Sequence, residues 1–129
     1  MTPYVEFMEI LGNAAEENCH LDSGISFEEL SKENSLYVEL GEPFVETEYY
    51  DKSTIRTVPV LFLCRHKDQV RCLEQLQEIC DYFQRLQQYP HGKTFRWLDT
   101  EIAKGPSKIG RDEDGTYHYS CILNAKLFF

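Results

Sequence analysis

The amino-acid sequence predicts an α+β fold, in which a mostly antiparallel β-sheet of about five strands carries two α-helices on one face. Three observations support this prediction. The stretch from residue 49 to residue 86 reads as a turn, a strand rich in β-branched residues and an amphipathic helix. Apolar and polar side chains alternate along the C-terminal segment. The predicted order, helix, three strands, helix, two strands, is typical of an antiparallel sheet covered by helices on one face.

The first helix is predicted to begin at Thr2-Pro3. Threonine caps a helix well, and proline fits the first helical position because its missing N–H costs nothing there. Helical spacing of apolar residues then continues to about Cys19, through Tyr4, Phe7, Met8, Leu11, Ala14 and Ala15. The following residues, 20–34, are polar, with a short helical turn expected at residues 27–30.

Three strands are predicted next: Ser35–Leu40, Phe44–Tyr50 and Thr54–Cys64. The last two form a hairpin around Asp51-Lys52-Ser53, since Asp and Ser side chains can close turns. Pro59 has no backbone N–H, so the third strand lacks one hydrogen-bond donor for pairing with a neighbouring strand. We therefore expect that strand to be bulged, or to lie at a sheet edge, at the proline.

Asp68 to Gln88 is the strongest predicted helix, and Tyr89-Pro90-His91-Gly92 ends it. Its main apolar stripe consists of Val70, Leu73, Leu76, Cys80 and Phe83. Three further residues widen this stripe: Cys72, Ile79 and Leu86. A stripe of this width indicates a helix that packs on the sheet.

Two strands are predicted after this helix, Thr94–Ala103 and Thr116–Phe129. The polar residues between them, 104–115, are predicted to form a loop, with Asp114-Gly115 as a hairpin-type turn. One face of the last strand consists of Tyr117, Tyr119, Cys121, Leu123, Ala125 and Leu127. The apolar end of this strand, residues 127–129, needs cover from this subunit or a neighbouring one.

Length, charge and cysteine content narrow the functional class. The 129 residues fit a single domain, 1–129, with an ordinary hydrophobic content of 42%. The net charge of −9, with scattered basic residues, argues against binding to nucleic-acid phosphates. The five cysteines lack C-x-x-C spacing, which indicates folding in a reducing compartment. No leader-like or membrane-spanning segment is visible, so we expect a soluble chain made in a cytoplasm.

Candidate metal ligands and nucleophiles do not show the spacing that their chemistry requires. A zinc site would need four ligands to come together, such as Cys19, His20, Cys64 and His66. Their spacing in the sequence does not indicate this. Cys121 and His118 are three residues apart on a predicted strand and therefore point to opposite faces. We expect no metal and no cofactor.

The acidic and glycine-containing segments of the 104–115 loop also lack a reaction signature. Asp112-Glu113-Asp114 precede a glycine turn, where carboxylates are normally solvated. Gly105-Pro106-Ser107-Lys108 lacks the full phosphate-loop pattern. The sequence therefore predicts a protein that is not an enzyme.

Aromatic residues make up 13% of the chain, and several are expected to be exposed at predicted turns and strand ends: Tyr49, Tyr50, Tyr89 and Phe128. Large amphipathic rings are enriched at protein interfaces. Together with the missing chemistry, they favour a protein that works by assembling with others.

Two segments resemble the minor capsid or tail terminator proteins of tailed phages of Gram-positive hosts. The first is Tyr50-Asp51-Lys52-Ser53, followed by Ile55, Pro59, the apolar strand and the helix through Asp81-Tyr82-Phe83. The second runs from Asp112 to Ser120 and leads into the terminal strand. Phe95-Arg96-Trp97 and Pro106 lie between them in the expected order. The sequence departs from the family at Lys52, where relatives often carry glycine at the hairpin turn.

The resemblance implies a structural virion subunit that forms a hexameric ring at the head-proximal end of the tail. The ring would terminate tail tube polymerisation and join the tail to the head connector. The implied partners are copies of itself, the major tail tube protein and the head–tail connector protein, while DNA passes through an acidic lumen without specific binding. We expect the assembly contacts at Tyr49, Tyr50, Asp51, Lys52, Ser53, Lys108, Arg111, Asp112 and Phe128.

Two alternatives stay open from the sequence. One is another head–tail connector, neck or tail-completion protein, which gene order beside the major tail protein would distinguish. The other is a non-viral cytosolic interaction module, which detection of the chain in purified particles would rule out. A small enzyme is the weakest alternative, because no pocket chemistry can be assembled from these residues.

Overall fold

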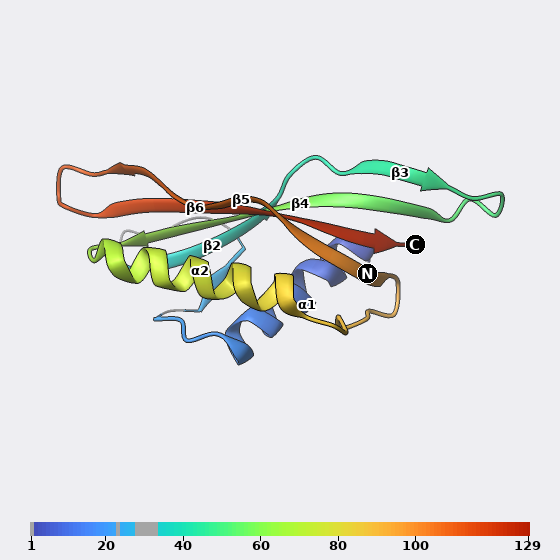
Figure 1. Ribbon diagram of the computed structural model, residues 1–129, viewed down its shortest axis with the longest axis horizontal. Helices are drawn as coiled ribbons and strands as arrows, with labels where there is room; N and C mark the ends of the chain where they lie inside the picture. Colours follow the sequence, from blue (N-terminus) through green and yellow to red (C-terminus); the bar gives the residue numbers. More distant parts are fainter. Residues whose placement is uncertain (1, 23, 28–33) are drawn as a thin grey trace.

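The computed structural model describes residues 2–22, 24–27 and 34–129, and these residues form two helices and six strands. The elements are α1 (Pro3–Asn18), β1 (Ile25–Ser26), β2 (Ser35–Leu40), β3 (Phe44–Glu48), β4 (Thr54–His66), α2 (Gln69–Arg85), β5 (Arg96–Arg111) and β6 (Tyr117–Phe128). Both helices lie on the same side of the sheet, and two long hairpins extend beyond them at opposite ends (Figure 1). The predicted α+β class is confirmed. The helical turn expected at residues 27–30 lies almost entirely outside the described residues.

β4 is the central strand of the sheet. The strand order is β1-β2-β4-β6-β5, and β3 also pairs with β4. Every pairing is antiparallel except the short one between β1 and β2. β6 pairs with β4 from Ile55 to His66, while the other side of β4 is shared by β2 and β3. β5 and β3 therefore lie at opposite edges of the sheet.

Pro59 lies where the second neighbour of β4 changes. β2 ends its pairing at Val60, and β3 begins at Thr57. The carbonyl oxygen of Pro59 accepts a hydrogen bond from the Gly41 N–H at 2.8 Å. The amide nitrogen and carbonyl of one strand residue point the same way, so the missing proline N–H faces this gap between β2 and β3. The sequence predicts either a bulge or a sheet edge at Pro59. The edge-like arrangement is present, because the pairing of β4 with β6 is regular at Pro59 and shows no bulge.

The core lies between the helices and one face of the sheet. β4 and β6 supply it with alternating side chains: Val58, Val60, Phe62, Cys64, Cys121, Leu123, Ala125 and Leu127. Trp97 on β5 stacks on Phe83 of α2, with ring centroids 5.4 Å apart, and on Tyr89, at 4.9 Å. The expectation that Tyr89 is exposed is wrong, because only 7% of it is exposed and its hydroxyl donates to the Phe83 carbonyl.

The apolar stripe of α2 differs from the predicted one. Val70 and Leu73 are 55% and 44% exposed, whereas Gln75 is buried. The buried face consists of Cys72, Gln75, Leu76, Ile79, Cys80 and Phe83. The helix is therefore rotated so that its buried face is centred on Leu76 and Ile79. The Gln75 amide is accommodated because its oxygen accepts from the Asp22 N–H and its nitrogen donates to the Arg71 carbonyl.

The predicted loop from residue 104 onward is largely a strand. β5 continues to Arg111, and only residues 112–115 form the turn to β6. The pairing of β5 with β6 is irregular at four places, including both sides of Lys104. These bulges allow a Gly- and Pro-containing segment to follow the long, regular β6.

Candidate assembly surfaces at the hairpin tips

The tip of the β3–β4 hairpin is a tight turn closed by backbone and side-chain hydrogen bonds. The Tyr49 N–H donates to the Ser53 carbonyl at 2.9 Å, and the Lys52 N–H donates to the Tyr49 carbonyl at 3.0 Å. The Asp51 carboxylate accepts from the Ser53 N–H at 3.0 Å and from its hydroxyl. These hydrogen bonds lower the pKa of Asp51. The turn is therefore built by the Asp and Ser that the sequence analysis selected.

The tip of the β5–β6 hairpin repeats this turn. The Asp112 N–H donates to the Thr116 carbonyl at 2.8 Å, and the Gly115 N–H donates to the Asp112 carbonyl at 3.0 Å. Asp114 accepts from the Thr116 N–H at 3.0 Å, and the side chain and N–H of Thr116 together lower the pKa of the Asp114 carboxyl group. Residues 49–53 and 112–116 thus share one hydrogen-bonding pattern, with Asp and Ser or Thr at equivalent positions.

The two turns differ in the residue that adopts a left-handed backbone. Gly115 has a φ of 89°, and Lys52, at the equivalent position, has a φ of 71°. Glycine tolerates this region freely, whereas a residue with a Cβ is strained there by roughly 1–2 kcal/mol. Lys52 therefore occupies at the first tip the conformation that glycine occupies at the second, at an energetic disadvantage.

Aromatic side chains surround the first tip. Tyr50 is fully exposed, and Tyr49 is 47% exposed. The Tyr49 ring meets Phe128 of β6 edge-on, with centroids 6.2 Å apart. A shallow hollow between them is lined by Tyr49, Tyr50, Asp51, Ser53 and Phe128. The structure thus brings Phe128 together with the predicted tip residues, although 75 residues or more separate them in the sequence.

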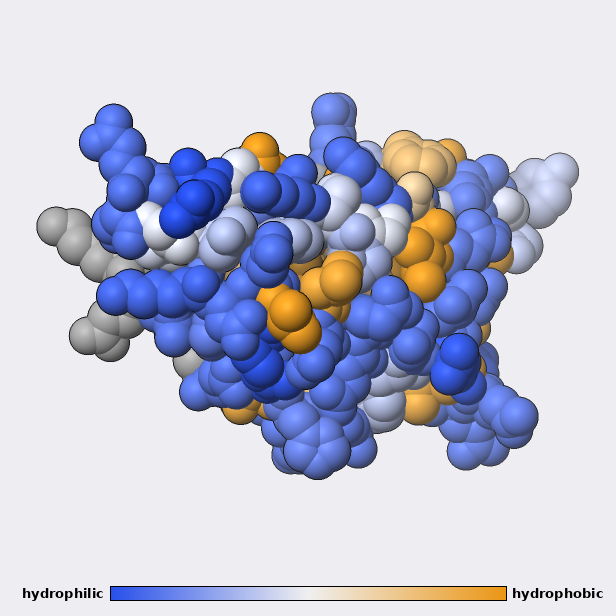
Figure 2. Space-filling view, turned by 60° about the vertical axis from the view of Figure 1, so that its left-hand side comes forward, coloured by the Kyte–Doolittle hydropathy of each residue, from blue (hydrophilic) through white to orange (hydrophobic). Residues whose placement is uncertain are grey.

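Charged side chains surround the second tip. Asp112 forms an ion pair with Arg65 at 3.0 Å and a hydrogen bond with His118 at 3.0 Å. Lys108 and Arg111 lie over the ring of Tyr117, at 5.2 and 5.4 Å from its centroid. Figure 2 brings this end forward and shows apolar surface only as separate patches in a mainly hydrophilic surface.

The predicted assembly residues therefore fall into two groups at opposite ends of the molecule. Tyr49–Ser53 and Phe128 lie together at the first tip, while Lys108, Arg111 and Asp112 lie at the second (Figure 1). Sequence reasoning missed three exposed apolar residues beside them, Phe44, Val45 and Ile109. The adjacent apolar pair at the start of β3 was the available signal, since one strand face alone cannot bury both residues.

A comparison with protein-family models identifies the family of this chain. The family model described as bacteriophage tail terminator protein matches residues 28–127, which is most of the chain. This chain belongs to the bacteriophage tail terminator family. No curated protein shows a significant match to it. The tail terminator family is a family of phage tail structural proteins, so a structural role in the tail follows for this chain.

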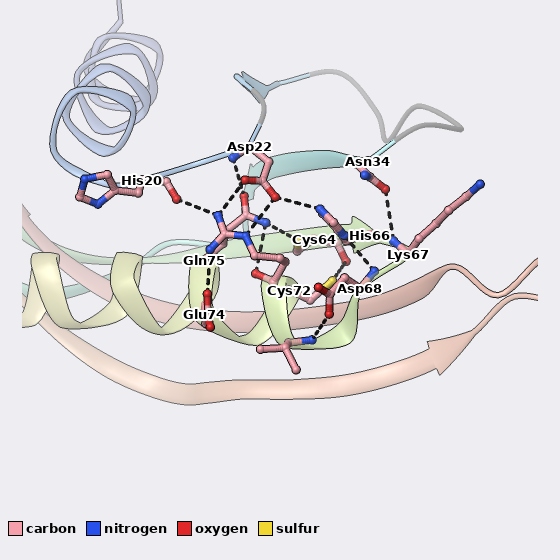
Figure 3. Close-up of polar contacts among 12 residues, drawn as sticks. His20, Asp22, Asn34, Cys64, His66, Lys67, Asp68, Cys72, Glu74 and Gln75 are labelled. Atoms are coloured by element: carbon pink, nitrogen blue, oxygen red, sulfur yellow. Dashed lines mark hydrogen bonds and ion pairs between the residues drawn. The ribbon is translucent and has the colours of Figure 1, made fainter.

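One polar cluster of this tail terminator superficially resembles a reactive site and lies between β4 and α2 (Figure 3). Asp22 receives two hydrogen bonds from the Arg71 guanidinium, at 2.8 and 3.1 Å, and one from His66 Nε2 at 2.9 Å. The Asp68 N–H donates to His66 Nδ1 at 2.9 Å, which fixes the tautomer with its hydrogen on Nε2. The bonds from Arg71, and then from His66, lower the pKa of Asp22.

This cluster fixes the segment after α1 to the rest of the tail terminator fold. Besides holding Asp22, Arg71 donates to the His20 carbonyl at 3.2 Å and to Glu74 at 2.8 Å. The Glu78 carboxylate accepts from the His20 N–H at 2.9 Å. Each donor named here thus has an acceptor within the protein, which suits a structural contact rather than a site for a substrate.

The cysteines of the tail terminator are buried in its core, and none is paired in a disulfide. Burial raises the pKa of the Cys19 thiol to about 11. A hydrogen bond with Cys72 raises the pKa of Cys64, and one with Cys80 raises that of Cys121. Among the residues that the structure describes, no three His, Cys, Asp or Glu side chains gather where they could hold a metal ion. The helices within these residues are also too short or too polar to cross a membrane.

Proposed function

We propose that this tail terminator forms a ring, expected to be hexameric, at the head-proximal end of a phage tail. The ring stops polymerisation of the tail tube and joins the tail to the head connector. Its partners are neighbouring copies of the chain, the major tail tube protein and the connector protein, so its location is the virion. The match of the tail terminator family over residues 28–127 is the observation that carries this proposal.

The shape of the subunit supports a role in assembly. Two hairpins extend beyond the helices at opposite ends of the long axis (Figure 1). Contacts at two different ends of a subunit are heterologous, and heterologous contacts generate rings when the rotation between subunits closes. We therefore assign assembly contacts to both tips: Tyr49–Ser53 with Phe128 at one end, and Lys108, Arg111 and Asp112 at the other.

The charge of the chain is compatible with DNA passing through the ring. A net charge of −9 gives a surface that repels phosphate groups. Two basic residues near the tips are neutralised within the subunit, since Lys52 pairs with Glu48 at 3.5 Å and Arg65 with Asp112 at 3.0 Å. The lumen would therefore guide DNA without retaining it.

The proposal is tested by light scattering of the purified chain, alone and mixed with major tail tube protein. We expect a defined oligomer, and capped tubes of limited length when the chain is added to polymerising tube subunits. A double variant, Tyr49→Ser with Tyr50→Ser, retains the turn-forming residues 51–53 and should fold but assemble poorly, because it lacks the exposed rings.

Val70→Ser is a suitable control, since it removes an apolar side chain that is 55% exposed on α2 and belongs to neither hairpin. This control should assemble like the unmodified chain. A chain that stays monomeric and leaves tube length unchanged would refute the proposed function. Normal assembly of the double tyrosine variant would refute only the assignment of the first tip.

A further inference from the structure

The first hairpin carries an excess of negative charge on an open sheet edge. We define the acidic arm as residues 41–53, which contain β3 and its turn. The arm has four carboxylates, Glu42, Glu46, Glu48 and Asp51, against one ammonium group, Lys52, for a net charge of −3. All five residues of β3 are exposed, and its only strand partner in the described part of the chain is β4. Glu46 lies 3.8 Å from Lys126 and Glu48 lies 3.5 Å from Lys52, whereas Glu42 and Asp51 have no ion pair within the described residues. The arm therefore presents an unpaired backbone edge with an excess of acidic side chains.

The opposite edge of the sheet carries an excess of positive charge. We define the basic edge as residues 104–111 of β5, which contain Lys104, Lys108 and Arg111 and no acidic residue, for a net charge of +3. All three cations are exposed. None of them has an ion pair within the described residues, whereas Asp112 and Asp114 of the adjacent turn are turned toward Arg65, at 3.0 and 3.9 Å. The positive charge of this edge is therefore available to a partner.

These two surfaces cannot meet within one subunit. The arm pairs with residues 54–57 of β4, at the end of the sheet where β6 finishes, while residues 107–111 of the basic edge pair with the start of β6. They also lie on opposite edges of the sheet. At about 3.3 Å per residue, the 13 residues of β4 separate the two ends by roughly 40 Å. Complementary charge at two distant, opposite corners is an arrangement that a second copy of the chain can satisfy.

We propose that the acidic arm of one subunit docks on the basic edge of the next subunit, and this inference rests on the ring-forming function proposed above. Exposed apolar residues accompany the charges on both surfaces: Phe44, Val45 and Tyr50 on the arm, and Ile109 on the basic edge. The contact is head-to-tail, so each subunit uses its arm on one neighbour and its basic edge on the other. This is the geometry that a closed ring of identical subunits requires.

Side chains, rather than a continuous backbone ladder, carry this contact. The basic edge is irregular between Lys104 and Ser107 and again between Lys108 and Gly110, and it contains Pro106, which has no N–H. Bulges and proline at an edge strand oppose backbone pairing with another chain. Charge complementarity then supplies specificity and correct orientation, and its effect decreases with salt.

Charge reversal on each surface tests the pairing. The arm-reversed variant carries Glu42→Lys and Glu48→Lys, and the edge-reversed variant carries Lys104→Glu and Lys108→Glu. Each variant alone places like charges across the contact, and we expect self-association to weaken by about tenfold or more at low salt. An equal mixture of the two variants restores opposite charges at every contact, so oligomers of alternating subunits should form again.

Two controls match the change in net charge on exposed residues of the helices and of the segment between α2 and β5. They are Glu9→Lys with Glu17→Lys, and Arg85→Glu with Lys93→Glu. Circular dichroism verifies that all variants are folded, and light scattering at two salt concentrations measures their association. We expect both controls to associate like the unmodified chain.

The possible results separate this inference from the proposed function. Oligomers of the unmodified chain that neither reversal weakens would refute the arm-to-edge contact and leave the proposed function intact. Reversals that weaken only binding to tail tube protein would assign the two surfaces to that partner and refute the contact between copies. An unmodified chain that neither oligomerises nor acts on tubes would refute the proposed function itself.

Discussion

The two matched turns allow a stability prediction with opposite signs at the two ends of the molecule. Lys52 and Gly115 share the left-handed conformation and the same hydrogen bonds. Replacing Lys52 by glycine removes roughly 1–2 kcal/mol of backbone strain from the folded protein. It also makes the unfolded chain more flexible, which lowers the free energy of unfolding by about 0.4–1 kcal/mol. We therefore expect Lys52→Gly to stabilise the protein by about 0.5–1 kcal/mol. Gly115→Ala should destabilise it by a similar amount.

The side chain introduced by Gly115→Ala does not clash with its surroundings. A Cβ at Gly115 would meet the Arg111 guanidinium at 3.6 Å, which is ordinary van der Waals contact. The Lys52 side chain forms only an exposed ion pair with Glu48 at 3.5 Å, and such pairs contribute little. Lys52→Ala removes this pair while retaining a Cβ, so it serves as the control and should not stabilise the protein.

Urea denaturation of the four proteins, with the unmodified chain as reference, measures these differences in the free energy of unfolding. Each transition is recorded at two protein concentrations, because self-association would raise the apparent stability. Lys52→Gly that is no more stable than Lys52→Ala would refute the strain argument. Gly115→Ala without loss of stability would refute the equivalence of the two turns.

Three further predictions concern the core, the polar cluster and the orientation of α2. Thr100→Val removes the acceptor of a buried indole N–H, at 2.9 Å, and should lower the free energy of unfolding by about 1–3 kcal/mol in urea titrations. The Asp22 carboxyl has a pKa below its ordinary value of 3.8 because of Arg71, so its contribution is present above that pH and lost as pH falls through the lowered pKa. Asp22→Asn should therefore be less stable at pH 6 and lose less stability on acidification, as followed by circular dichroism; equal acid sensitivity would contradict this. Leu76→Ala should destabilise the chain by about 2–5 kcal/mol and Leu73→Ala by under about 1 kcal/mol. Similar shifts in melting temperature for these two variants would favour the predicted apolar stripe of α2 over the observed one.

Strands with regular alternation could be predicted from the sequence, and strands that depend on a partner could not. β2, β4 and β6 each show their own apolar periodicity, because one face of each is buried. Residues 104–111 contain Lys, Gly, Pro and Ser, which favour loops. They form a strand because the long β6 offers a ladder along its whole length, and this long-range cause is invisible in the local sequence.

The error in α2 has a similar origin. Val70 and Leu73 fit a helical stripe, yet they lie to the side of the helix face that packs on the sheet, which is centred on Leu76 and Ile79. Gln75 was not predicted to be buried, because its partners come from the segment after α1 and from α2 itself. The conformation of the two turns could be predicted from the sequence, because Asp, Ser and Gly act there through local hydrogen bonds. The exposure of β3 and Ile109 could not, because it depends on which other elements pack against them.

The change of neighbours at Pro59 has a mechanical consequence. The tip of the first hairpin extends beyond the helices (Figure 1), so a pull on it passes through β4 into the neighbouring β6. β6 runs alongside β4 for twelve consecutive residue pairs, and a load along the strand direction is shared among them instead of opening one bond at a time. A force applied at one corner of the subunit is thereby distributed along the central strands of the sheet.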